Sequence, residues 1–208
     1  MIVPTMNQEE ACMELDRDAE AVERWRVRLL TSIRHRVMKC TKFPIAKWLD
    51  YISPRKNRYI MHLRIHEKRM RTVLTGLVAI RHEDDGLTAY VRWGDRYMII
   101  IPHAFKRYAE RVGVDKYGIE LIKHYFLHNV HGKDEKNARL VGRSVRWNGE
   151  EHQACCVSEG VLLGQVTDKY FLVRTFITYD MATGKQKEVF DARHERVLRI
   201  SEMFNLTN

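Results

Sequence analysis

Three strand-like segments follow one another in residues 73–101, VLTGLVAIRHEDDGLTAYVRWGDRYMIII. Each is rich in β-branched and aromatic residues, which fit the pleated, half-buried surface of a sheet. Clusters of turn-forming residues separate them, Glu83-Asp84-Asp85-Gly86 first and Gly94-Asp95 second. The pattern predicts consecutive antiparallel strands over 73–81, 87–93 and 96–101.

The same alternation returns later in the chain, after two predicted helices at about 103–112 and 116–130. Asn148-Gly149 is a strong hairpin signal between two of the later strands. A terminal helix is expected at about 186–204. Hairpin strands with helices grouped between them indicate an α+β fold in which helices pack on an antiparallel sheet. The later strands are expected at about 139–147, 152–157, 160–166 and 170–179.

The residues before this region read as helical. Apolar residues recur at three-to-four spacing over 7–39, and Asn7 with Glu10 forms a candidate capping box. A short second helix is expected at 45–52. We therefore predict a helical, basic N-terminal region over 1–72 and an α+β domain over 73–208.

Composition narrows the class of protein. The 208 residues are 45% hydrophobic and 30% charged, which is typical of a globular chain. No apolar stretch approaches the roughly 20 residues that a membrane helix needs, and no signal-peptide pattern is present. Four cysteines without a C-x-x-C pair suggest reduced thiols. We expect a cytoplasmic protein with no membrane association.

Positive charge is concentrated in one segment. The formal net charge is +9, yet residues 25–72 alone hold fourteen Lys and Arg against Asp50 and Glu67. Trp25, Trp48 and two tyrosines are interleaved with these cations. Cations neutralise phosphates and aromatic rings stack on unpaired bases, so the pattern indicates a surface that binds RNA or DNA with little sequence preference. The predicted nucleic-acid-binding residues are Arg34, Arg36, Lys39, Arg55, Lys56, Arg58, Arg64 and Arg69.

Two other interpretations of this segment remain open. The acidic N-terminus, with seven Asp and Glu against two Arg in residues 1–24, could fold back and neutralise a solvated helical face. An acidic protein partner could also bind the segment.

The predicted helix at 103–112 carries a single polar face. At about 100° per residue, His103, Arg107, Glu110 and Arg111 share one sector, opposite Phe105 and other apolar residues. A neutral imidazole can accept a proton and two guanidiniums can hold a phosphate, as metal-free phosphodiester cleavage requires. The competing interpretation is a surface helix held by ion pairs of Glu110.

The string His-Ala-x-x-Arg-x-x-Glu-Arg, from His103 to Arg111, resembles the helical signature of toxin-like domains of the barnase, colicin and RelE-like ribonuclease group. Residues 159–164 and 174–177 are similar to sheet strands in phage and mobile-element proteins of unknown function. The resemblance implies a helix packed on an antiparallel sheet and RNA cleavage without a metal. It implies that sheet residues complete the site, and the candidates are Arg174, Thr175 and Thr178.

A second polar stripe lies on the predicted helix at 116–130. Glu120, His124, His128 and His131 share one face, and Cys155 is a candidate additional donor for a transition metal. His124 and His131 are about 10 Å apart along a helix axis, whereas zinc–nitrogen bonds are about 2.0–2.1 Å. One ion cannot bind all three imidazoles, although it could bind His124 with His128, or His128 with His131, together with ligands from elsewhere. A polar surface stripe is the favoured interpretation, so we expect no metal and no cofactor.

Taken together, the residues predict a protein that interacts with nucleic acid, in one of two forms. The first is a metal-independent endoribonuclease with its site at His103, Arg107, Glu110 and Arg111. The alternative is a non-catalytic accessory or structural protein of a phage or mobile element that binds nucleic acid or a protein partner. A homo-oligomer built through the N-terminal helix is a third expectation.

Overall fold

A computed structural model of the chain describes residues 1–69, 73–129, 145–147 and 150–203. The chain divides into two compact units, Met1–Asp84 and Asp85–Asn208. The α+β class is confirmed, with helices packed on sheet strands. Residue 72, the expected domain boundary, lies outside the described residues, and the strand that follows it belongs to the first unit.

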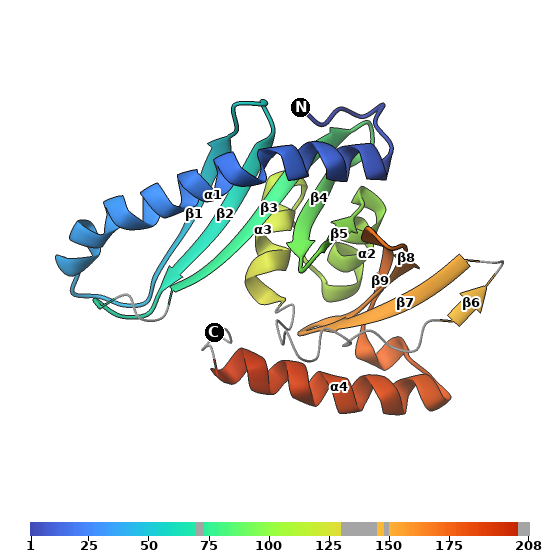
Figure 1. Ribbon diagram of the computed structural model, residues 1–208. Coiled ribbons are helices and arrows are strands. Elements are labelled where there is room, and N and C mark those ends of the chain that lie inside the picture. Colours follow the sequence, from blue (N-terminus) through green and yellow to red (C-terminus); the bar gives the residue numbers. More distant parts are fainter. Residues whose placement is uncertain (70–72, 130–144, 148–149, 204–208) are drawn as a thin grey trace. The chain divides into compact units, whose positions relative to one another are not determined.

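The first unit begins with the long helix α1, Gln8–Met38 (Figure 1). Its start is the predicted capping box. The Asn7 side chain accepts from the backbone N–H of Glu10 at 2.9 Å, and the Asn7 N–H donates to the Glu10 carboxylate at 2.9 Å. Both bonds satisfy donors that a helix start leaves unpaired. The helix expected over 7–39 is therefore confirmed.

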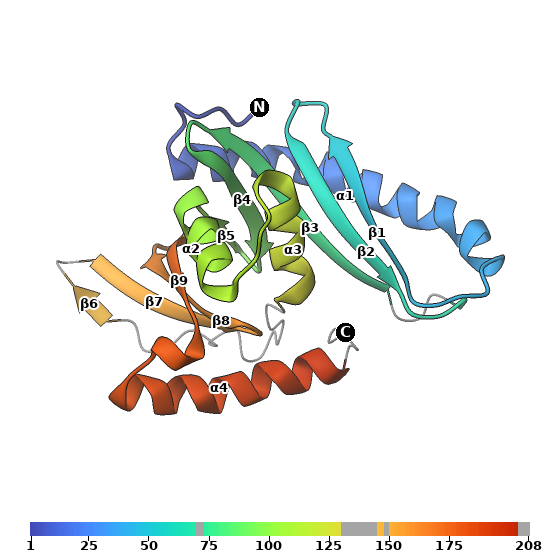
Figure 2. The ribbon, with the colours of Figure 1, turned by 180° about the vertical axis from the view of Figure 1, so that it is seen from behind.

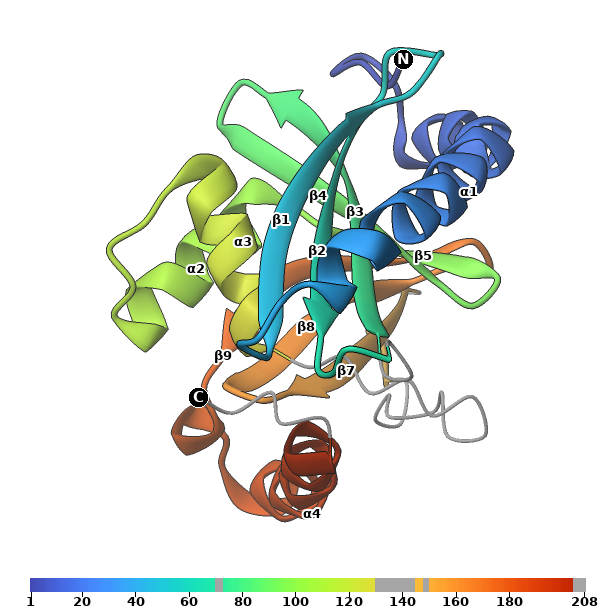
Figure 3. The same cartoon turned by 90° about the vertical axis from the view of Figure 1, so that its left-hand side faces the viewer.

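Three antiparallel strands complete the first unit, and α1 lies along one face of them (Figure 3). On β2, buried Met61, Leu63 and Ile65 alternate with half-buried residues, and together with Val37 of α1 they form a core. This alternation is what a strand with one covered face requires. The strands are β1, Ile45–Ile52; β2, Arg58–Ile65; and β3, Val73–Glu83.

The short helix expected at 45–52 is wrong, because these residues form β1. Ile45, Trp48, Leu49 and Ile52 fit a helical period, which is why the pattern misled. The segment is also rich in aromatic and β-branched residues, and pairing along the whole of β2 decides the outcome. The helical description of residues 1–72 therefore holds for α1 alone among the described elements.

The second unit contains strands in the order β4-β5-β9-β8-β7-β6. Neighbours pair antiparallel, as predicted, except β5 and β9, which run parallel. A parallel pair needs a long crossover, and the described part of this crossover contains two helices and three strands. The strands are β4, Gly86–Trp93; β5, Arg96–Ile100; β6, Val145–Trp147; β7, Glu150–Val157; β8, Gly160–Val166; and β9, Tyr170–Ile177.

Three predicted helices of this unit are confirmed, and a 3-10 turn, η1, at Tyr179–Met181 precedes the last of them. Most of the strand expected at 139–147 lies outside the described residues, as does the turn Asn148-Gly149. None of the helices in the described part of the chain is long and apolar enough to cross a bilayer. The helices are α2, Pro102–Val112; α3, Gly118–His128; and α4, Gly184–Met203.

Aromatic residues fill the core between α2, α3 and the strands of the second unit. The ring of Tyr108 meets those of Tyr125 and Phe176 edge-on, at centroid distances of 5.0 and 5.2 Å. Edge-to-face contacts of this kind are favourable beyond the area they bury. The apolar side of α2 is thereby fixed against β9, which determines where its polar side points.

Candidate nucleic-acid interface

The basic segment folds so that most of its charge gathers at one end of the first unit. Val37 near the end of α1 and Ile65 at the end of β2 belong to one hydrophobic core, and Phe43 and Ile45 pack against it. Figures 1 and 2 show the C-terminal end of α1, the start of β1 and the end of β2 at this end. We call the cations there the basic end: Arg34, Arg36, Lys39, Lys42, Lys47, Arg64, Lys68 and Arg69.

The basic end lacks local neutralisation. Seven of its eight cations are exposed, and Arg64 is half-buried. Glu67 is the one acid within the two stretches 34–47 and 64–69. Within the described residues, no carboxylate forms an ion pair with any of the eight. The result is a surface of one sign at the end of a rigid helix.

The acidic residues of the N-terminus do not reach this surface. Even Glu23, the last of them, is about 16 Å from Arg34 along the helix axis, about twice the Debye length of 8 Å at physiological salt. Several also have cationic partners nearby, since Glu20 pairs with Arg24 and Glu23 with Arg26. The acidic half of α1 therefore does not cancel the field of the basic end.

The other three predicted nucleic-acid residues lie at the opposite end of the β1–β2 hairpin. Arg55 donates two hydrogen bonds of 2.8 Å to the buried carboxylate of Glu14. These bonds, with a smaller contribution from the N-terminal amine, lower the pKa of Glu14 to about 2. Arg58 pairs with Asp50 at 2.9 Å, and Lys56 is an exposed turn residue with φ of 61°. Arg55 is thus a structural partner of α1.

The aromatic residues interleaved with the cations are divided between two environments. The ring of Trp25 stacks on that of Tyr51 at 4.5 Å, and Tyr51 contacts Tyr59, whose hydroxyl bonds to Asp18. These three rings join α1 to the strands. Trp48 instead packs on His62 at 4.9 Å, on the face of the hairpin that α1 does not cover. Three of the four rings are thus committed to the packing of α1 on the strands.

The polar face of α2 is organised differently from the predicted catalytic site. His103 is exposed, and Arg107 pairs with Glu110 at 2.9 Å. Arg111 donates a hydrogen bond from its guanidinium to the carbonyl oxygen of Phe176 on β9. Both guanidiniums therefore have partners within the chain, and a phosphate would have to displace them.

The sheet residues expected to complete that site have separate partners. Arg174 donates to the Gln165 side chain at 3.0 Å. The Thr178 hydroxyl bonds to Asp180, which lowers the pKa of that carboxyl, while Thr175 lies opposite Leu163 in the strand register. Within the described residues, no hydrogen bond or ion pair joins any of the three to His103, Arg107 or Arg111. The bond from Arg111 to β9 goes to the carbonyl oxygen of Phe176 instead.

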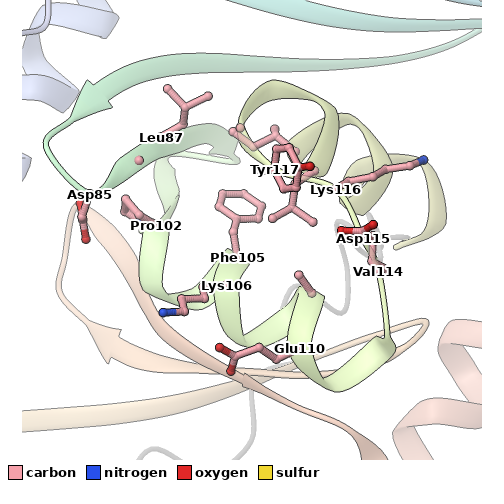
Figure 4. A pocket seen from close by; sticks show the side chains of 15 residues that line it. Asp85, Leu87, Pro102, Phe105, Lys106, Glu110, Val114, Asp115, Lys116 and Tyr117 are labelled. Atoms are coloured by element: carbon pink, nitrogen blue, oxygen red, sulfur yellow. The ribbon is translucent and has the colours of Figure 1, made fainter.

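A pocket of about 410 Å³ does lie beside α2, but on its other side. Phe105 points into it from α2, and Lys106 and Glu110 lie at its edge (Figure 4). Leu121 and Ile122 of α3 form part of its wall. Of the residues predicted to be catalytic, only Glu110 lines this pocket.

Sequence reasoning missed a polar network that joins α2, α3 and the β7–β8 turn. Tyr108 donates to Glu159 at 2.6 Å, and the Asn129 side chain donates to the same carboxylate oxygen at 2.7 Å. The backbone N–H of Glu159 returns a bond of 3.1 Å to Asn129. Burial and the bond to Glu159 raise the pKa of Tyr108. No periodic signal could reveal Glu159, because it is distant from its partners in sequence.

His124, a residue of the predicted histidine stripe, contributes to this network. Its Nδ1 lies 3.1 Å from the Tyr108 hydroxyl, and burial first and His128 second lower its pKa. The His124 ring stacks on that of His128 at 4.0 Å. Since the Tyr108 hydroxyl already donates to Glu159, His124 Nδ1 is the donor to it.

Metal ligation finds no support in the residues described. No group of three or more His, Cys, Asp or Glu side chains there is arranged to hold an ion. His131 lies outside the described residues. Burial raises the pKa of the Cys155 thiol to about 12, and the thiolate is the form that binds metals.

Comparison of the chain with protein-family models, with curated proteins and with solved structures finds no match.

Proposed function

We propose that this protein binds nucleic acid through the basic end and that binding, rather than catalysis, is its activity there. The observation that carries the proposal is the gathering of eight cations, without a paired carboxylate among the described residues, from two stretches that are separated in sequence. A surface of this kind neutralises successive phosphates and releases their counterions. RNA remains the favoured ligand and DNA the alternative.

A purely structural role does not account for the whole set. Basic residues near a helix C-terminus complement the macrodipole, which is equivalent to about half an elementary charge. Arg36 lies in the last turn of α1 and Lys39 caps it. One or two cations suffice for that purpose, whereas the basic end contains eight.

The committed aromatic rings favour backbone contacts over base stacking. Trp25, Tyr51 and Tyr59 pack between α1 and the strands, so they cannot serve as stacking platforms. Affinity would then depend on phosphate number more than on base identity. We expect weak sequence preference and a steep dependence on salt.

The partners of Arg107 and Arg111 argue against placing chemistry at α2. Metal-free cleavage needs cations poised over a phosphate. Here one guanidinium is paired with a carboxylate and the other is bonded to a backbone carbonyl.

Fluorescence anisotropy with labelled 16-nucleotide RNA and with DNA of the same sequence tests the proposal. Each neutralised phosphate contributes a slope of about −0.9 for duplexes or −0.7 for single strands to a plot of log affinity against log salt. Engagement of about five cations predicts a slope of about −3.5 on single strands. A flat plot, or no binding at 50 mM salt, would overturn the proposal.

A further inference from the structure

Three side-chain nitrogens near the end of β2 are buried without a hydrogen-bond partner. They are Nε2 of His62, Nε of Arg64 and Nε2 of His66, and none finds a partner among the described residues. Buried polar atoms in native proteins are nearly always satisfied, so each such atom needs a reason. Three of them within the five residues 62–66 point to a common cause.

These residues share a location. Met61, Leu63 and Ile65 face α1, so His62 and Arg64, which alternate with them, point to the other face of the hairpin. His66 follows directly after the strand. The charge of Arg64 acts on both imidazoles, and together with burial, which is the larger cause, it lowers the pKa of His62 and of His66. His62 and Arg64 are two residues apart on one face of the strand, about 7 Å at 3.3–3.4 Å per residue, and His66 follows two residues after Arg64.

The chemistry of the cluster is that of a site for an anion. A guanidinium can only donate, and an imidazole N–H donates as well. Among the residues that the structure describes, no carboxylate pairs with Arg64, and burial and Arg64 are the causes that lower the pKa of His62 and of His66. An anion would accept hydrogen bonds from all three residues and would offset the positive field around them.

We propose that His62, Arg64 and His66 form a phosphate-binding seat on the face of β2 that α1 does not cover. The inference rests on the proposed function, because Arg64 belongs to the basic end and the phosphate is that of the nucleic-acid backbone. Trp48 lies opposite His62 in the strand register and packs on its ring, which holds the imidazole in place.

Imidazole NMR of the full chain, with inorganic phosphate and separately with a 16-nucleotide RNA, tests the seat. In the wild type we expect the ring signals of His62 and His66 to shift with either probe. Arg64→Gln should abolish these shifts and weaken phosphate binding by about tenfold or more, as loss of a charge-assisted hydrogen bond implies. The matched control is Arg58→Gln, on the same strand and face but paired with Asp50, which should retain them.

The outcomes separate the two proposals. Shifts with RNA alone support a seat that binds phosphate as part of the polymer. If RNA binds and the ring signals of His62 and His66 do not shift, the phosphate-binding seat is refuted and the proposed function still stands. Shifts with inorganic phosphate in a protein that binds neither RNA nor DNA support the seat and overturn the proposed function.

Discussion

Replacing Arg34, Arg36 and Lys39 by glutamine removes three exposed cations from the basic end without touching its core. All three lie at the C-terminal end of α1, and none has a carboxylate partner in the described part of the chain. If each contacts one phosphate of a duplex, the salt slope should become shallower by about 2.7. With a slope of about 0.9 per contact, each contact raises the affinity about eightfold when the salt concentration falls from 1 M to 0.1 M.

The triple variant should therefore bind a duplex up to about 500-fold more weakly at 0.1 M salt. Between 50 and 200 mM salt, the fold-loss of its affinity should be about 40 times smaller than that of the wild type. The assay is fluorescence anisotropy across that salt range. Circular dichroism serves as a check on folding, because loss of cations near a helix C-terminus costs about 0.3–1 kcal/mol each.

A matched triple variant removes the same charge elsewhere. Lys106→Gln, Lys187→Gln and Arg196→Gln alter exposed cations of α2 and α4 in the second unit. Its affinity and salt slope should stay within about twofold of the wild type. Equal losses in the two triple variants would mean that net charge alone governs binding, and the reasoning from the basic end would be refuted.

Three further outcomes follow from the contacts described above. Glu14→Gln should lower the free energy of unfolding at pH 7 by about 2 kcal/mol, a value that is reduced because Arg55 is exposed to solvent. The pKa of Glu14 in the folded state is depressed from 4.5 to about 2. In urea unfolding, the stability advantage of the wild type should therefore be complete above pH 5 and fade as the pH falls toward 2. A pH-independent difference would contradict it. Gly164→Ala should destabilise the fold by about 1–3 kcal/mol in thermal unfolding, because a Cβ there would collide with the carbonyl of Leu172, and an unchanged Tm would count against that packing. RNA incubated with the protein in EDTA should stay intact; cleavage that disappears in His103→Ala would instead favour the ribonuclease resemblance.

Local patterns predicted most of the elements correctly. The capping box at Asn7 and Glu10 marks the start of α1, and the single polar face of residues 103–111 marks α2. Both signals depend on residues that are close together in the sequence. The segment 45–52 shows where this fails, because its spacing suits a helix while its partner strand makes it β1.

The candidate site depends on contacts that no local pattern contains. The two halves of the basic end come together because Val37 and Ile65, which are far apart along the chain, share one hydrophobic core. The pairing of Arg55 with Glu14 likewise spans 41 residues. Charge counting identified the basic segment but could not separate cations free to bind a phosphate from those that hold the fold.

Lysine footprinting tests the central claim most directly. The protein is acetylated with and without saturating 16-nucleotide RNA, and modification of each lysine is measured by mass spectrometry. The account predicts protection of Lys39, Lys42, Lys47 and Lys68, with Lys106 and Lys187 labelled equally in both samples. Protection confined to lysines of the second unit, or equal labelling of all lysines while RNA is bound, would contradict it.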